Sequence, residues 1–173
     1  MGNLKAKMGQ YAEARAYHER SIRIIEASMG TQHALLAKPL SSLASLLHVT
    51  GAETAAAWAL AERAYRIRVR ALGDSHPEVA DSAATLGVLH LAAGNVERSL
   101  EWHRRSHALW SSVYGPNHPQ VAMALSNIAA VYAAQAKFPQ ALQARQQCLL
   151  IERRSLGDTH PQVAGLTTVS PPI

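Results

Sequence analysis

The sequence predicts an all-α protein in which antiparallel helix pairs stack one after another into a solenoid. The main observation is a segment that recurs as LGDSHPEVA, YGPNHPQVA and LGDTHPQVA, with a weaker copy, MGTQHALLA, earlier in the chain. The glycines of the three clear copies, Gly73, Gly115 and Gly157, are 42 residues apart, and Gly30 precedes Gly73 by 43. A period of this length indicates an array of one small unit and not a globule around a single core.

The composition also favours helices over sheets. Hydrophobic residues make up 48% of the chain but aromatic residues only 5%, so alanine and leucine provide most of the packing. No apolar run approaches the ~18 residues of a membrane span and nothing resembles a signal peptide, so we expect a cytoplasmic protein. The single cysteine, Cys148, excludes an internal disulfide framework and a cysteine-based metal site, and its apolar neighbours predict a core position.

Each unit is predicted to contain two helices. In chain order these are 34–49 and 54–72, then 77–93 and 96–113, then 119–135 and 138–156. Alignment of Gly9 with Gly94 places Met1 in the middle of a first helix. The predicted units are therefore 1–30 (partial), 31–73, 74–115, 116–157 and 158–173 (a truncated unit and tail). Neither end has an evident polar capping helix, so we expect self-association through uncapped ends.

The junctions between units contain residues that end one helix and start the next. Gly73 and its equivalents follow the last apolar residue of a helix, where a left-handed residue closes the helix at little steric cost. Asp74-Ser75, Asn117 and Asp158-Thr159 carry side-chain oxygens suited to capping the next helix. Pro77 and its equivalents occupy the first turn, where a missing N–H removes no helical bond.

Equivalent positions inside the helices carry apolar or small residues in every unit. The sets are Leu43, Leu86 and Ile128; Leu46, Leu89 and Val131; Ala44, Gly87 and Ala129; Ala14, Ala57, Ser99 and Ala141; Ser21, Ala64, Ser106 and Cys148; and Ile24, Ile67, Leu109 and Ile151. A lone helix pair with this pattern leaves one apolar face exposed, and the next pair covers it. We expect these positions to form the core.

This pattern resembles the tetratricopeptide repeat. The matching residues are Leu86-Gly87, Gly94, Ser99 and Ser106 in the third unit, and Ile128-Ala129, Tyr132, Phe138, Ala141 and Cys148 in the fourth. The usual unit has about 34 residues, so the longer period and the L-G-x-x-H-P-x-V-A junction resemble the long-repeat subclass typified by kinesin light chain. The resemblance implies a right-handed superhelix and a non-catalytic scaffold that binds a protein or peptide.

The resemblance also implies a binding groove, because the first helices of such repeats line the concave side. Carried over to this sequence, the groove face comprises Lys38, Ser41, Ser42, Ser45, Asp81, Ala84, Thr85, Val88, Met123, Ser126, Asn127 and Ala130. Relatives that grip a terminal carboxylate use a cluster of Lys, Arg and Asn. Here only Lys38 and Asn127 remain, separated by Asp81, so we expect an extended peptide instead. The alternatives are a groove that is only solvated or is filled by another segment of the parent protein.

The histidines do not predict a metal site. His76, His118 and His160 recur at one repeat position, but successive units stack about 8–10 Å apart, whereas zinc needs ligands about 2 Å from one ion. We expect them to cap or pack the helix starts. His103 and His107 have the i, i+4 spacing of a helical metal pair but no third ligand with suitable spacing, so an exposed or half-buried helix face explains them better.

Other functions find little support. No nucleophile motif, carboxylate pair or glycine-rich phosphate loop occurs, so we expect no enzyme and no cofactor. Lys and Arg outnumber Asp and Glu by 17 to 12, but the stripe of Arg63, Arg66 and Arg70, with Arg68, is better explained as a solvated face than as a nucleic-acid track. The remaining alternative is a structural or regulatory spacer of a larger signalling protein, with no ligand of its own.

Overall fold

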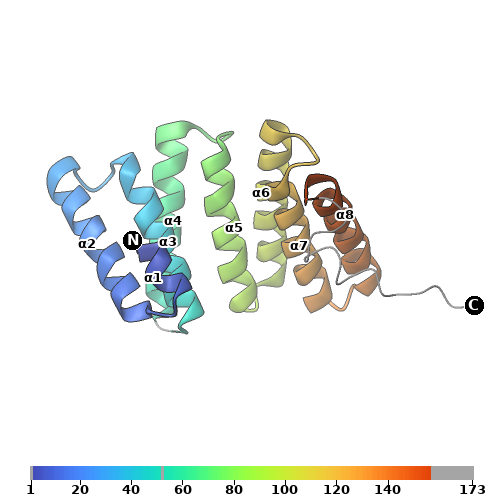
Figure 1. The fold of residues 1–173 in the computed structure, drawn as a ribbon, viewed down its shortest axis with the longest axis horizontal. Helices are drawn as coiled ribbons and strands as arrows, with labels where there is room; N and C mark the ends of the chain where they lie inside the picture. Colours follow the sequence, from blue (N-terminus) through green and yellow to red (C-terminus); the bar gives the residue numbers. More distant parts are fainter. Residues whose placement is uncertain (1, 52, 157–173) are drawn as a thin grey trace, which may run out of the picture.

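The computed structural model describes residues 2–51 and 53–156, and every regular element in these ranges is a helix. The elements are α1 (Gly2–Lys7), α2 (Tyr11–Met29), the 3₁₀ turn η1 (Ala34–Leu36), α3 (Ala37–Val49), α4 (Thr54–Leu72), α5 (Pro77–Ala92), α6 (Val96–Tyr114), α7 (Pro119–Ala134) and α8 (Phe138–Leu156). Figure 1 shows a row of stacked helices that follows the order of the sequence. Each α-helix packs against the next one along the chain, while α3 also touches α5 and α5 touches α7. The predicted all-α solenoid of antiparallel helix pairs is confirmed.

Part of the prediction lies outside the described residues. This applies to the truncated unit at 158–173, including Asp158, His160 and Pro161, and to Gly157. None of the described helices combines the length and the apolar character needed to cross a bilayer.

The helix bounds agree closely with the prediction except at the start of α3. The predicted helix 34–49 begins as a 3₁₀ turn, in which the N–H of Leu36 donates to the carbonyl of His33 over 3.0 Å. Pro39 explains the difference, because it has no N–H to donate to the carbonyl of Leu35 and α-helical bonding cannot extend back through it. In α5 the proline is Pro77, at the first helical position, where no bond is lost.

Histidines cap the helices that follow the junctions. Nδ1 of His76 accepts a hydrogen bond from the N–H of Glu78 over 3.1 Å. His33 and His118 accept in the same way from the N–H two residues further on, over 3.3 Å and 3.2 Å. The acceptor role of Nδ1 places the proton of the neutral ring on Nε2.

The prediction that Asp74 and Asn117 cap these helices is wrong. Asp74 precedes the capping residue of α5 by two positions, and His76 already bonds the N–H that an oxygen would cap. Asp74 accepts a hydrogen bond from Arg105 of α6 over 2.8 Å, and Asn117 accepts one from Arg154 of α8 over 3.2 Å. Asp74 and Asn117 therefore each bind the second helix of the unit that they begin, which is α6 for Asp74 and α8 for Asn117.

The core lies between the helix pairs, as the repeat pattern predicted. Leu43, Leu86 and Ile128 are buried. Ile24 is a correction, because its side chain is 56% exposed. The short helix α1 lies against α2, where Gly2 meets the ring of His18, and the neighbours Ile22 and Ile25 supply the core contacts of this part of α2 instead.

Candidate peptide-binding groove

The predicted groove residues lie on α3, α5 and α7, the first helices of three successive units. On α5 they are Asp81, Thr85 and Val88, whose spacing of four and three residues puts them on one face of the helix. Asp81 is exposed, Thr85 is half-buried and Val88 is 37% exposed. This face is therefore open to solvent, unlike the opposite face, which packs in the core.

The three helices, together with Trp110 of α6, line an open central hollow of about 410 Å³. Its lining comprises Ser45, His48, Val49, Asp81, Ala84, Thr85, Val88, Leu89, Trp110, Met123 and Asn127. Predicted groove residues from all three units thus meet around one space. Sequence reasoning missed His48 and Val49, which extend the α3 face beyond Ser45 by one further turn. Trp110 of α6 also forms part of this lining, although its ring is only 1% exposed.

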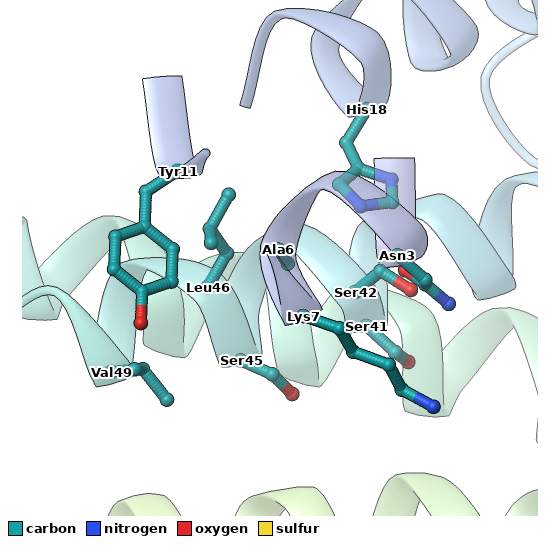
Figure 2. Close-up of a pocket in the computed structure, with 10 residues that line it drawn as sticks. All are labelled: Asn3, Ala6, Lys7, Tyr11, His18, Ser41, Ser42, Ser45, Leu46 and Val49. Atoms are coloured by element: carbon teal, nitrogen blue, oxygen red, sulfur yellow. The ribbon is translucent and has the colours of Figure 1, made fainter. Parts of the chain in front are cut away.

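A second hollow, of about 470 Å³, lies between α3 and the two N-terminal helices; we call it the N-terminal hollow. Figure 2 shows its lining, which comprises Asn3, Ala6, Lys7, Tyr11, His18, Ser41, Ser42, Ser45, Leu46 and Val49. Sequence reasoning missed the contribution of α1. The signal was present, because the repeat alignment places Asn3 at the position of Val88.

The two hollows form one inner groove, because both are lined by Ser45 and Val49 of α3. Lys38 lies toward the N-terminal end, where it lines a neighbouring recess with Ser42. Asn127 lines the central hollow. Lys38 and Asn127 therefore line different parts of the inner groove.

Two predicted groove residues, Ser41 and Ser126, are engaged by arginines. Nη1 of Arg68 donates to Oγ of Ser41 over 3.2 Å, and Nη1 of Arg145 donates to Oγ of Ser126 over 3.0 Å. Ala130, the remaining predicted residue, is exposed on α7. Each of these serine hydroxyls thus accepts one bond within the protein and keeps its own O–H as a donor.

Arg68 is not part of a solvated stripe, and this expectation is corrected. Its side chain is 7% exposed. It donates to the hydroxyls of Ser41 and Ser82 and pairs with Glu78, with 3.3 Å between Nε and Oε2. A buried guanidinium is tolerated only when its N–H groups find such partners. The network joins α4 to α3 and to α5, and so fixes one unit of the groove relative to the next.

The electrostatics of the inner groove change along its length. Asp81 is the one charged side chain that lines the central hollow, and no cation among the described residues lies within ion-pair distance of its carboxylate. Burial raises the pKa of Asp81, and the nearby Arg68 opposes this shift. Lys7 and Lys38 lie toward the N-terminal end.

The expectation that His103 lies on an exposed or half-buried face is wrong. The ring is 1% exposed and lies against Gly87, whose missing side chain leaves room for it. Burial lowers the pKa of His103 to about 4, and its Nδ1 has no hydrogen-bond partner. His107 is half-buried. Within 2–51 and 53–156, no three His, Cys, Asp or Glu side chains gather as metal ligands would.

Comparison with known proteins identifies the class to which this fold belongs. The family model described as Tetratricopeptide repeat matches residues 1–68 and 83–149. The chain therefore belongs to the tetratricopeptide repeat family, whose members are in general protein-interaction scaffolds. No curated protein matches the sequence.

Solved structures place the chain near the kinesin-light-chain-like repeats that its long period predicted. One is BtubC (BKLC) from P. vanneervenii, with 22% identity and a TM-score of 0.78, covering 92% of this chain and 63% of that chain. Another is a candidate kinesin light chain from Podosopora anserina with nearly identical TPR-like repeats, solved as the original and as a variant, each with 21% identity, a TM-score of 0.77, and 95% and 77% coverage. The chain thus spans less than two thirds of BtubC, and at these identities the likeness is one of fold.

Proposed function

We propose that this protein is a non-catalytic scaffold that binds an extended peptide, or an extended segment of another protein, in its inner groove. The observation that carries the proposal is the central hollow, in which side chains from three successive units surround one open space. Apolar side chains are exposed there, since Val49, Val88 and Met123 are 66%, 37% and 46% exposed. Apolar surface left open beside a few polar groups is typical of a binding site.

The polar groups of the groove suit a peptide backbone. The amide of Asn127 can donate to a carbonyl and accept from an N–H, and the hydroxyl of Ser45 can do either. Small residues such as Ala84 leave room for ligand side chains. Because the Arg68 network holds α3 and α5 in place, the groove is largely formed before the ligand arrives, which lowers the entropic cost of binding.

The proposal is tested by selecting ligands and then removing groove side chains. Phage-displayed random dodecapeptides would be selected on the wild-type chain and re-synthesised for titration. We expect Lys38→Ala combined with Asn127→Ala to weaken binding about tenfold or more, because each removes a hydrogen-bonding group worth about 1 kcal/mol. Helicity by circular dichroism should be unchanged.

The matched control is Glu97→Ala combined with Arg98→Ala, two exposed positions on α6 that line neither hollow. This pair should leave the affinity as it is. If the groove pair binds the selected peptides as tightly as the wild type, the groove is not the site. If no peptide is selected at all, the spacer alternative gains support.

Nucleic-acid binding is the weaker alternative, because many arginines are engaged within the protein. Arg63 pairs with Glu26 over 2.6 Å and Arg105 with Asp74 over 2.8 Å, while Arg68 is buried. Binding to generic DNA or RNA through the remaining cations would fall steeply as salt rises. Failure to bind either at low salt would remove this alternative.

A scaffold of this kind needs no cofactor, and we propose a cytoplasmic location for it. Self-association through the array ends is supported by the apolar side chains of Ile24, Met29 and Leu35, which are 56%, 52% and 56% exposed at the N-terminal end.

A further inference from the structure

The central hollow has an unusual charge for this protein. The chain carries a formal charge of +5, yet among residues 2–51 and 53–156 the only charged group that lines the hollow is the carboxylate of Asp81. The cation with the largest effect on its pKa, Arg68, has N–H groups engaged by Ser41, Ser82 and Glu78. Asp81 is therefore an acidic group without an ion-pair partner among the residues that the structure describes.

The repeat does not require an acidic residue at this position. Lys38 and Met123 occupy the equivalent positions of the neighbouring units, so one helix register carries a cation, a carboxylate and a thioether in turn. The backbone of Asp81 has an ordinary role in α5, where its carbonyl accepts from Thr85 over 3.1 Å. No described contact within the protein explains why this position carries a carboxylate. The Asp81 side chain lines the open space of the central hollow.

Apolar side chains make up much of the wall around Asp81, beside the polar groups of Ser45, Thr85 and Asn127. Val88 and Leu89 of α5 and Met123 of α7 line the same space. A site with one carboxylate and aliphatic walls matches a side chain that has an apolar stem and a cationic head. Lysine and arginine have this form, since their methylene groups can lie along apolar surface while the charged end reaches an oxygen.

We propose that the central hollow receives a lysine or arginine side chain of the bound peptide, with its stem against Val88 and Met123 and its charged head on Asp81. The inference rests on the proposed peptide-binding function and specifies its ligand. It commits the occupant to a peptide with a basic residue beside apolar ones. An acidic peptide would place its carboxylate next to Asp81, and the like charges would repel.

The raised pKa of Asp81 agrees with this assignment. Although Asp81 is exposed at the helix surface, partial shielding from water raises its pKa, so an arriving cation compensates for lost hydration. The same reasoning predicts that the charge-dependent part of binding weakens as salt is added, because the hollow is open and its charges are screened.

The experiment compares peptides that differ only in the central side chain. Fluorescein-labelled random octapeptide pools would be made with lysine, arginine, norleucine or glutamate at one fixed position. Norleucine keeps an apolar stem and lacks the charge. Fluorescence anisotropy against the full chain should show the lysine and arginine pools binding about tenfold more tightly than the norleucine pool, and the glutamate pool most weakly.

Asp81→Asn is the decisive variant, because it keeps the shape and removes the charge. It should abolish the preference for lysine over norleucine. Glu97→Gln makes the same change in net charge at an exposed α6 position outside both hollows and should preserve that preference. Thermal unfolding of both variants checks that the fold is retained.

Two results would overturn the inference in different ways. If the wild type binds the norleucine or glutamate pool as tightly as the lysine pool, or if Asp81→Asn keeps the lysine preference, the cation assignment is wrong while groove binding stands. If none of the four pools binds, the proposed function fails together with the inference.

Discussion

The contact between Gly87 and His103 offers a test of how the repeat is packed. A Cβ placed on Gly87 would lie 2.6 Å from Cε1, 2.7 Å from Nε2 and 2.8 Å from Nδ1 of His103. These distances are too short for a carbon atom, and the ring has little room to move because it is 1% exposed. Gly87→Ala is therefore expected to overpack the interface, at a cost of about 1–3 kcal/mol.

The same substitution also has a favourable effect, which must be subtracted. Alanine stabilises the interior of a helix by about 1 kcal/mol relative to glycine. The net result of Gly87→Ala in the wild type is then a loss of about 1 kcal/mol in the free energy of unfolding. This corresponds to a fall of about 2–4 °C in the melting temperature for a chain of this size.

The neighbouring unit supplies the control. The same two repeat positions carry Ala44 and Ala61, which are buried in one cluster. In a His103→Ala background the ring is gone, so Gly87→Ala should stabilise the protein by about 1 kcal/mol. Urea denaturation of the wild type, the two single variants and the double variant, followed by circular dichroism, gives the coupling energy.

The cycle has a definite outcome that contradicts the packing described above. If Gly87→Ala changes the free energy of unfolding by the same amount with and without the His103 ring, the two residues are not in contact. A coupling energy of about 1–3 kcal/mol, with the sign that favours the double variant, is the result expected from the structure.

Three further predictions follow from buried and exposed groups. Burial lowers the pKa of His103 from 6.5 to about 4, so the contribution of the neutral His103 ring to the free energy of unfolding is fully present above pH 6.5 and is lost as the pH falls toward 4, by up to about 3 kcal/mol. In urea titrations, His103→Gln should flatten the dependence of stability on pH over this range. An unchanged slope would contradict the assignment. Burial is the main cause that raises the pKa of Cys148 to about 11, and the side chain is 0% exposed. A thiol reagent should therefore label Cys148 only when the protein unfolds. Rapid labelling of the native protein would show that the core is open at this position. Static light scattering should detect concentration-dependent association through the apolar N-terminal end, which Ile24→Glu should reduce; a monodisperse wild-type monomer would oppose this prediction.

The sequence by itself determined the repeating unit and most helix limits. These features depend on residues that are close together along the chain. A glycine with positive φ ends α2, α4 and α6, at Gly30, Gly73 and Gly115, and a proline in the first turn is compatible with only a few backbone positions. Periodic apolar residues then show which face of each helix is covered. Such signals are local, so the all-α solenoid could be predicted without coordinates.

Only the tertiary structure decided how individual polar side chains are used. A helix pattern cannot show that Gly87 leaves space for an imidazole, that Arg68 finds two hydroxyls on different helices, or that His76 acts as a cap in place of Asp74. These outcomes depend on the size and position of partners that are distant in the sequence.

The inner groove shows both contributions. The sequence pattern assigns groove residues to each first helix separately. These residues line one common hollow only if three units stack at a particular spacing and rotation. Asp81 and Met123 are far apart along the chain and line the same space only because α5 touches α7. The physical reason is that stacking buries the apolar faces between helix pairs, and the geometry of that burial fixes which exposed side chains face one another.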